Sequence, residues 1–311
     1  MGIINFILSI SELILPSGVQ IFKDEECSVP KISVGFELSP IAKIIQDKID
    51  LFERDGYNYY YLKNPQSIYS FSEFISLLCK GEIFFVEKIE EPINLLRLVL
   101  KDFPHCSSPI VNLSIGITGD INEEEVIELA RLIPDSIISL HNSYYNLERV
   151  FGKHIYRGKE NFIANFSPPP YSEDFCSFLV FLKVMNNREF RVRFSPETAP
   201  SPFFIYLSIE KVPFLTLYPS EKEIKRAALD LLGWVVSLTK EESRSKLLVF
   251  MASMGVEMDT FKNWILELES LEEEKVINMW KRYLMDGFVA CCDSILIKKL
   301  KEVFPESEVL E

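Results

Sequence analysis

The sequence predicts an α/β fold, namely a parallel (β/α)8 barrel of the TIM type. Between residues 31 and 132, apolar segments of strand length alternate with segments whose apolar residues have helical spacing. Four such units in succession favour a barrel, because two parallel strands need a crossover helix between them. The alternation returns between residues 203 and 303. We therefore expect one domain over residues 1–311, with an N-terminal extension over 1–30 and an irregular insertion over about 134–202.

The first half is expected to contain four strands, each followed by a helix. The strand over residues 31–36 ends before Ser39-Pro40, where a proline suits the first turn of a helix. Apolar spacing continues this helix to Phe52, and Asp55-Gly56 is the expected helix end. The remaining elements are expected as strands over 57–62, 82–86 and 110–115, and as helices over 70–78, 92–103 and 122–132.

The second half repeats the pattern with more helix. Asp293 is placed to cap the last helix, and Asn122 with Glu125 has the spacing of a capping box in the first half. The last residues of the chain offer one more short strand. The expected strands cover 203–207, 214–217, 234–238 and 287–291, and the expected helices cover 221–232, 240–254, 260–285 and 294–303.

The N-terminal segment is apolar but does not have the pattern of a membrane span. Apolar residues between Ile3 and Ile14 fall at helical spacing, which predicts a short amphipathic helix. The segment lacks a basic start and contains Glu12, and Pro16 makes it too short to span a bilayer. We expect this helix to cover one end of the barrel or a partner, and we expect no membrane association.

Composition fits a globular protein with a large core, since 48% of the 311 residues are hydrophobic and 25% are charged. A net charge of −13 without any Lys/Arg run argues against nucleic acid as a partner. The six cysteines have no CxxC spacing, which is typical of reduced thiols in a cytoplasmic protein. The three histidines lie far apart without HxxxH or HxH, so no metal site is expected.

Two strand-to-helix corners contain acids and provide the candidate site. They are Ile32–Pro40, which contains Glu37, and Val111–Asp120, which ends in Asp120. Because the C-terminal ends of barrel strands line the active site, both carboxylates are predicted at one rim. The alternative is that they are rim carboxylates or helix caps without a catalytic role. For Ser114, Gly116 and Gly119, close approach of the backbone to a ligand is weighed against simple turn geometry.

The predicted strands and the motifs at their ends together resemble those of the bacterial luciferase-like barrels. The similarity is closest to their archaeal branch, the coenzyme F420-dependent methylenetetrahydromethanopterin reductases. That branch has a Phe-Glu-Leu-Asn-Pro strand end, a second strand after a glycine and an aspartate, and a Leu-Gly-Ile-Gly-x-Gly-Asp corner. The matching segments, within residues 31–304, are Val34–Pro40, Asp55–Leu62, Ile83–Pro92, Leu113–Asp120, Phe203–Tyr206 and Asp286–Asp293.

This resemblance implies an oxidoreductase that holds F420 or FMN at the barrel rim and transfers a hydride to a pterin-like or other small substrate. It implies that Glu37 and Asp120 contact the substrate and assist the accompanying proton. It also implies a homo- or hetero-oligomer, because members of the family dimerise through helices beside the early strands. The implied cofactor-binding positions are Asn64, Lys88, Ile89, Ser114, Gly116 and Gly119.

The chain departs from the family pattern at three places. Lys63-Asn64-Pro65 stands where the family has an Asp-His pair, and Lys88-Ile89 replaces a Gly-Val pair. After Tyr206, the segment Leu207–Pro213 replaces a glycine-rich turn and a phosphate-binding helix, so one outer helix is expected to be shortened. A second hypothesis follows, in which the chain is a catalytically degenerate paralogue without cofactor that binds a protein partner or serves as a structural subunit.

Overall fold

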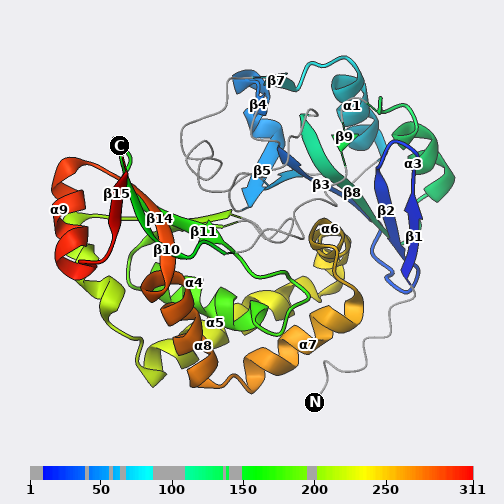
Figure 1. Ribbon diagram of the computed structural model, residues 1–311. Helices are drawn as coiled ribbons and strands as arrows, with labels where there is room; N and C mark the ends of the chain where they lie inside the picture. The colour runs from blue at the N-terminus through cyan, green and yellow to red at the C-terminus, as the bar shows by residue number, and fades with distance from the viewer. Residues whose placement is uncertain are drawn as a thin grey trace.

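The computed structural model describes residues 10–38, 42–55, 59–63, 68–86, 109–135, 138–139, 149–194 and 202–310. These residues form two large open sheets of mixed strand direction, with helices packed against them (Figure 1). The expected closed barrel is wrong, because neither large sheet closes on itself. A third, two-stranded sheet pairs β4 (Ala42–Ile44) with β7 (Phe84–Val86).

The first sheet has the strand order β1-β2-β8-β3-β6-β5, and β9 pairs with β8 beyond this path. One face of this sheet carries the first hydrophobic core, in which Ile21, Val34 and Ile115 pack with helix residues such as Phe74 and Val126. The elements are β1 (Ile10–Ile14), β2 (Gln20–Asp24), β3 (Lys31–Leu38), β5 (Phe52–Asp55), β6 (Tyr59–Leu62), α1 (Ile68–Cys79), β8 (Ile110–Thr118), α3 (Glu123–Ala130) and β9 (Ile138–Ser139).

The second sheet has the strand order β12-β13-β11-β14-β10-β15. Its core is larger and rich in aromatic rings, with Phe178, Phe203 and Tyr283 in edge-on contact. The strands are β10 (Gly152–Arg157), β11 (Phe162–Phe166), β12 (Arg191–Arg193), β13 (Pro202–Tyr206), β14 (Gly287–Cys292) and β15 (Glu308–Leu310). The helices are α4 (Phe175–Asn187), η3 (Ile209–Thr216), α5 (Glu221–Leu238), α6 (Arg244–Met254), α7 (Met258–Glu269), α8 (Glu273–Trp280), η5 (Lys281–Met285) and α9 (Ser294–Val303).

The two sheets repeat one topology. In each, a central strand (β8 or β14) is parallel to one neighbour (β2 or β10) and antiparallel to the other (β3 or β11). An antiparallel pair, β6-β5 or β13-β12, then extends the sheet, and a helix, α3 or α9, follows the central strand. The repeat has no fixed period in the sequence, because the connections that lead to the central strands differ in length. The connection from β6 to β8 covers residues 63–109, and the one from β13 to β14 covers residues 207–286.

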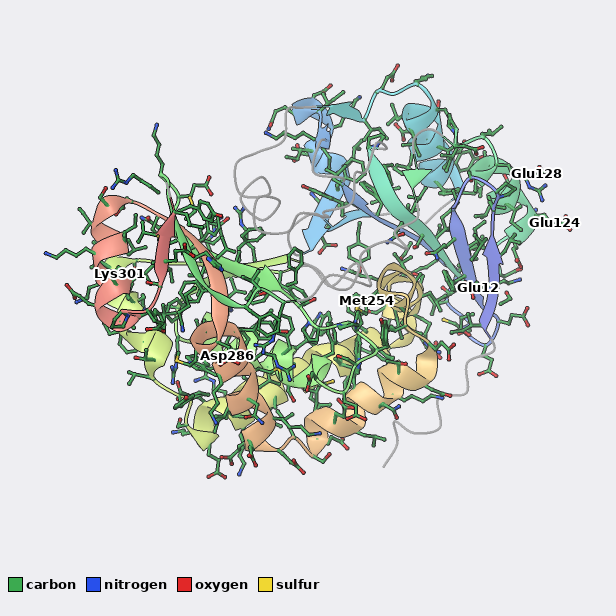
Figure 2. The ribbon with its side chains drawn as sticks, in the orientation of Figure 1. Glu12, Glu124, Glu128, Met254, Asp286 and Lys301 are labelled. Atoms are coloured by element: carbon green, nitrogen blue, oxygen red, sulfur yellow. The ribbon has the colours of Figure 1, made fainter. Side chains whose placement is uncertain are left out.

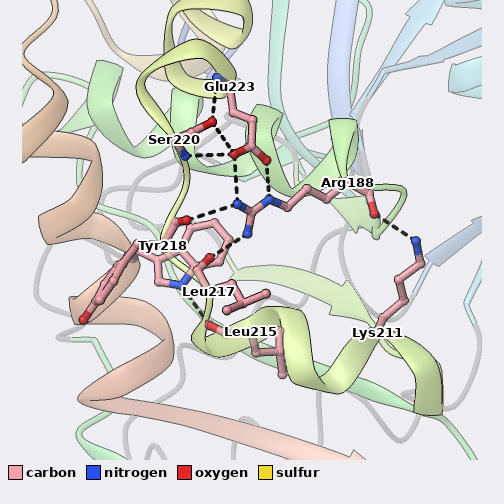
Figure 3. A network of polar contacts seen from close by, with 8 residues as sticks. Arg188, Lys211, Leu215, Leu217, Tyr218, Ser220 and Glu223 are labelled. Atoms are coloured by element: carbon pink, nitrogen blue, oxygen red, sulfur yellow. Dashed lines mark hydrogen bonds and ion pairs between the residues drawn. The ribbon is translucent and has the colours of Figure 1, made fainter.

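Arg188 ties together the helices beside the second sheet (Figure 3). Its guanidinium donates to both carboxylate oxygens of Glu223, at 2.6 and 3.1 Å, and to the carbonyl oxygens of Leu217 and Tyr218. Glu223 also completes a capping box with Ser220 at the start of α5. The bonds from Arg188, and to a lesser degree those from Ser220, together lower the pKa of Glu223 to about 2. This network fixes the C-terminal end of α4 against the start of α5.

Helix α6 belongs by sequence to the second half but packs on the first sheet, against β2, β3 and β8. Figure 1 shows it next to these strands, at the centre of the molecule. The close packing depends on Gly116 in β8, because a Cβ atom there would lie 2.2 Å from the Ser245 carbonyl oxygen. A strand glycine is typical where another backbone approaches closely. Helix α6 therefore connects the second half of the chain to the first sheet.

Several segments expected as helices contain strands in the structure. The helix expected from Pro40 to Phe52 contains instead β4, a 3-10 helix over Gln46–Leu51 and the start of β5. The helix end expected at Asp55-Gly56 is wrong, because Asp55 is the last residue of β5, which pairs antiparallel with β6. The expected N-terminal helix is wrong over Ile10–Ile14, which is strand β1.

The expectation of an irregular mid-chain insertion in a barrel is also wrong. In this region β10 and β11 belong to the second sheet, and α4 belongs to its hydrophobic core. The expected strand over 234–238 is the end of α5, and the one over 214–217 overlaps η3. The expected helix over 92–103 lies outside the described residues. Asp293 caps α9 as predicted, since it accepts bonds from Ile295 and Leu296 N–H, whereas Asn122 stands at the N-cap of α3 without a side-chain bond.

Candidate functional site

The face of the first sheet that lies under α6 carries several polar and small side chains. By strand alternation and register, Asp24, Ser33, Ser114 and Gly116 share this face, while Ile115 and its neighbours face the core. Hydrogen bonds and one ion pair hold the N-terminal end of α6 on this face, and Val249 of α6 packs there against Tyr61.

The central contact is a buried ion pair between Arg244 and Asp24, 2.9 Å apart, and Asp24 has no exposed surface. Next to it the hydroxyls of Ser33 and Ser245 lie 2.8 Å apart, and Lys31 Nζ donates to the Glu242 carbonyl oxygen at 2.6 Å. Removal of one partner from a buried ion pair costs about 3–5 kcal/mol, because the other charge is left uncompensated. These contacts join segments more than 200 residues apart in the chain.

A cavity of about 270 Å³ lies beside this junction, between β3, β5, β6 and the start of α6. Lys246 Nζ lies 4.3 Å from the centre of the Tyr61 ring and 3.6 Å from the Glu53 carboxylate. Among the described residues, the wall also contains Lys31, Lys63 and several hydroxyls but no histidine or cysteine. This set of groups is suited to holding a small polar or charged group. It offers no thiol–imidazole or hydroxyl–imidazole pair for nucleophilic catalysis.

Glu37 and Asp120 are not brought together. β3 and β8 are antiparallel, with Glu37 opposite Val111 at one end of β8, and Asp120 follows the other end after Thr118. The seven residue-to-residue steps from Val111 to Thr118 correspond to about 23 Å of strand. Asp120 is exposed in the turn before α3, and Glu37 is placed here only by its backbone. Their catalytic role stays a prediction. The antiparallel directions of β3 and β8 place the two residues at opposite ends of β8.

The predicted cofactor-binding residues fall in different places. Ser114 is buried beside α6, where its hydroxyl donates to Gln20 Oε1 at 3.2 Å. The close approach expected at Gly116 is made by the α6 backbone. Gly119 has a φ of +67° and lies against Pro30, so it serves the turn after β8. Asn64, Lys88 and Ile89 lie outside the described residues.

Sequence reasoning missed Asp24 and Arg244, which form the most buried polar contact of the junction. Nothing in the sequence pairs two residues that are 220 positions apart. Among the described residues, no group of three His, Cys, Asp or Glu side chains is arranged to hold a metal ion. Within the same residues, no helix combines the length and apolar composition needed to cross a bilayer.

No protein-family model matches the chain, and no curated protein is similar to it in sequence. Among solved structures, the fold is similar to that of the inactive peptidase M16 domain from Pseudomonas fluorescens, at 11% identity over 92% of this chain and 99% of that chain, with a TM-score of 0.53. A conserved protein from Enterococcus faecalis V583 and a protease from Helicobacter pylori match at 11% and 10% identity over 92% of this chain, each with a TM-score of 0.49. They cover 99% and 100% of those chains.

The predicted membership of the luciferase-like family is therefore wrong, and so are the F420 or FMN cofactor and the flavin-type oxidoreductase activity that depended on it. The strand-end motifs that carried the resemblance are short, and here they occupy antiparallel strands of an open sheet. The two-sheet topology and the structural match agree with each other over most of the chain. The chain has the fold of an M16-peptidase-like domain.

Proposed function

We propose that this chain is a non-catalytic protein-binding subunit built on the M16-peptidase-like fold. The observation that carries the proposal is a peptidase-type fold combined with a sequence that lacks a zinc-binding helix. Zinc peptidases of the H-E-x-x-H and H-x-x-E-H types place two histidines four residues apart on one helix. The three histidines of this chain are His105, His141 and His154, and none has a second histidine at that spacing.

Two further features support a binding role over a catalytic one. The one histidine among the described residues, His154, lies on β10, 3.4 Å from the Glu308 carboxylate of the neighbouring edge strand β15. The junction under α6 is filled by the chain itself, with its ion pair and serine pair already formed. In the inactive domain from Pseudomonas fluorescens, the same fold also occurs without activity.

The test combines cleavage and binding in one experiment. The purified chain is incubated with Zn²⁺, Co²⁺ or Mn²⁺ and a fluorescence-quenched peptide library, and the anisotropy of labelled library peptides is recorded in parallel. We expect saturable binding of a subset of peptides and no cleavage above the buffer blank. Chelator-sensitive cleavage that co-elutes with the chain in gel filtration would overturn the non-catalytic assignment. Absence of binding by any peptide would overturn the binding role.

A further inference from the structure

We propose that the outer edge of strand β1 binds a basic, extended segment of a partner protein by strand addition. The inference rests on the proposed protein-binding function and adds the surface and the chemistry of the partner. Within the part of the chain that the structure describes, β1 pairs with β2 alone and ends the path of the first sheet. An edge strand presents unpaired N–H and C=O groups that can pair with another chain.

The hydrogen-bond pattern identifies which groups of β1 are available. The hairpin closes with the Leu15 N–H donating to the Val19 carbonyl oxygen at 2.9 Å. Because bonded and non-bonded pairs alternate along an antiparallel ladder, Leu13 and Ser11 bond to β2. The N–H and C=O groups of Glu12 and Ile14 therefore point away from β2, toward the open edge. These are the positions at which an added strand would bond.

The side chains of β1 leave room for such a strand. All but the first residue of β1 are exposed, including Leu13 at 37% and Ile14 at 51%. By register, Leu13 shares the face of Ile21 and Ile14 shares the face of Gln20, so each face of the edge has one exposed apolar side chain. In strand addition, backbone bonds supply affinity and such alternate side-chain contacts supply specificity.

Acidic side chains surround this edge and determine the charge of the partner. Ile10 lies opposite Asp24 and Asp24 lies opposite Thr118, so the turns after β2 and β8 lie near the same end of β1. Figure 2 shows Glu12, Glu124 and Glu128 on this side of the molecule. Between residues 10 and 29 the only basic residue is Lys23, which pairs with Glu123 at 3.0 Å. The exposed acids are Glu12, Glu25, Glu26, Asp120, Glu124, Glu125 and Glu128.

A second copy of this chain fits the edge poorly. Pairing of two β1 strands would bring two copies of Glu12 and of the surrounding acids together, and like charges placed opposite each other are destabilising. A lysine- or arginine-rich strand from another protein would neutralise the same acids. Charge complementarity therefore favours a basic heterologous segment.

The probe is a capped, fluorescent eight-residue peptide of alternating lysine and valine. Two control peptides accompany it, one with glutamate in place of lysine and one N-methylated at alternate residues, which keeps the charge but removes strand donors. The variant Ile14→Pro removes one outward N–H of β1, and Ile14→Val is its matched control. Affinity is measured by anisotropy at low and high salt, and thermal unfolding of each variant confirms its fold.

We expect the basic peptide to bind at low salt, and Ile14→Pro or peptide N-methylation to weaken binding at least tenfold. Ile14→Val is expected to bind within about twofold of the wild type, since it keeps the N–H and a β-branched side chain. Equal binding of the N-methylated peptide would overturn the proposal, because it would show charge attraction alone. Dimerisation of the chain that Ile14→Pro abolishes would also overturn it, since a second copy would then occupy the edge. If library peptides bind independently of Ile14, this inference fails while the proposed function stands.

Discussion

Replacement of Gly116 by alanine is expected to destabilise the protein by pushing α6 off the first sheet. The new Cβ atom would lie 2.2 Å from the Ser245 carbonyl oxygen, 3.1 Å from Val249 Cγ2 and 3.2 Å from Leu248 Cβ. Real Cβ atoms essentially never lie closer than 3.0 Å to such an atom, so the helix start must move by at least 0.8 Å. The obstructing atom is backbone, which cannot rotate out of the way as a side chain can.

That movement would stretch the contacts next to it. The Arg244–Asp24 pair at 2.9 Å and the Ser33–Ser245 pair at 2.8 Å are made from the same helical turn. Overpacking of this kind costs about 1–3 kcal/mol, and loss of the hydrogen bonds places the expected effect at the upper end. We expect a lower urea midpoint for Gly116→Ala, measured by circular dichroism and by tryptophan fluorescence.

Gly233→Ala is the matched control. Gly233 lies within α5 with nothing within 4 Å of its Cβ position. The same substitution should there stabilise the protein by about 0.5–1 kcal/mol, because alanine is the better helix former. Opposite shifts of the two midpoints support the packing of α6 on β8. A Gly116→Ala variant as stable as the wild type would refute it.

Three further predictions concern the junction, the Arg188 network and the thiols. Arg244→Met should lower the free energy of unfolding by about 3–5 kcal/mol, and adding Asp24→Asn should restore a large part of that free energy. Strictly additive effects of the two substitutions in urea unfolding would show that the pair is not coupled. The bonds from Arg188 and Ser220 lower the pKa of Glu223 to about 2 in the folded protein, so the stabilisation that they give is present above pH about 4.5 and is lost as the pH falls toward 2. Glu223→Gln should therefore differ from the wild type at pH 7 and converge with it in acid, and a constant difference would contradict this. Cys79 is the one exposed thiol of the five described cysteines, so peptide mapping after brief alkylation should find it modified before the other four, and the reverse order would contradict the described burial.

Elements whose local sequence signal is compatible with only one secondary structure are predictable from the sequence. The apolar run of β8, the capping aspartate before α9 and the strand β14 were found because their local signals have few competitors. The pair Asp55-Gly56 reads as a helix end because helical apolar spacing precedes it, but in the structure Asp55 is the last residue of β5, which pairs antiparallel with β6. Strand direction then followed from that choice, so an antiparallel β3–β8 pair was interpreted as two parallel strands.

The candidate site shows that local sequence patterns do not predict which distant residues come together. Glu37 and Asp120 share a corner pattern in the sequence, but whether two corners meet depends on strand direction, which local patterns do not encode. At Gly116 the expectation is an approach of the backbone to a ligand, whereas the group that lies against Gly116 in the structure is the backbone of α6, more than 100 residues later in the chain. The Asp24–Arg244 pair was invisible because each residue is ordinary in its own sequence context.

The proposed non-catalytic role requires that the purified chain holds no zinc ion. Element-specific mass spectrometry of the chain, after equilibration with excess Zn²⁺ and gel filtration into zinc-free buffer, measures this. We expect zinc far below one equivalent per chain and no change in thermal unfolding on addition of a chelator. One tightly held zinc per chain, with a chelator-induced loss of stability, would contradict it.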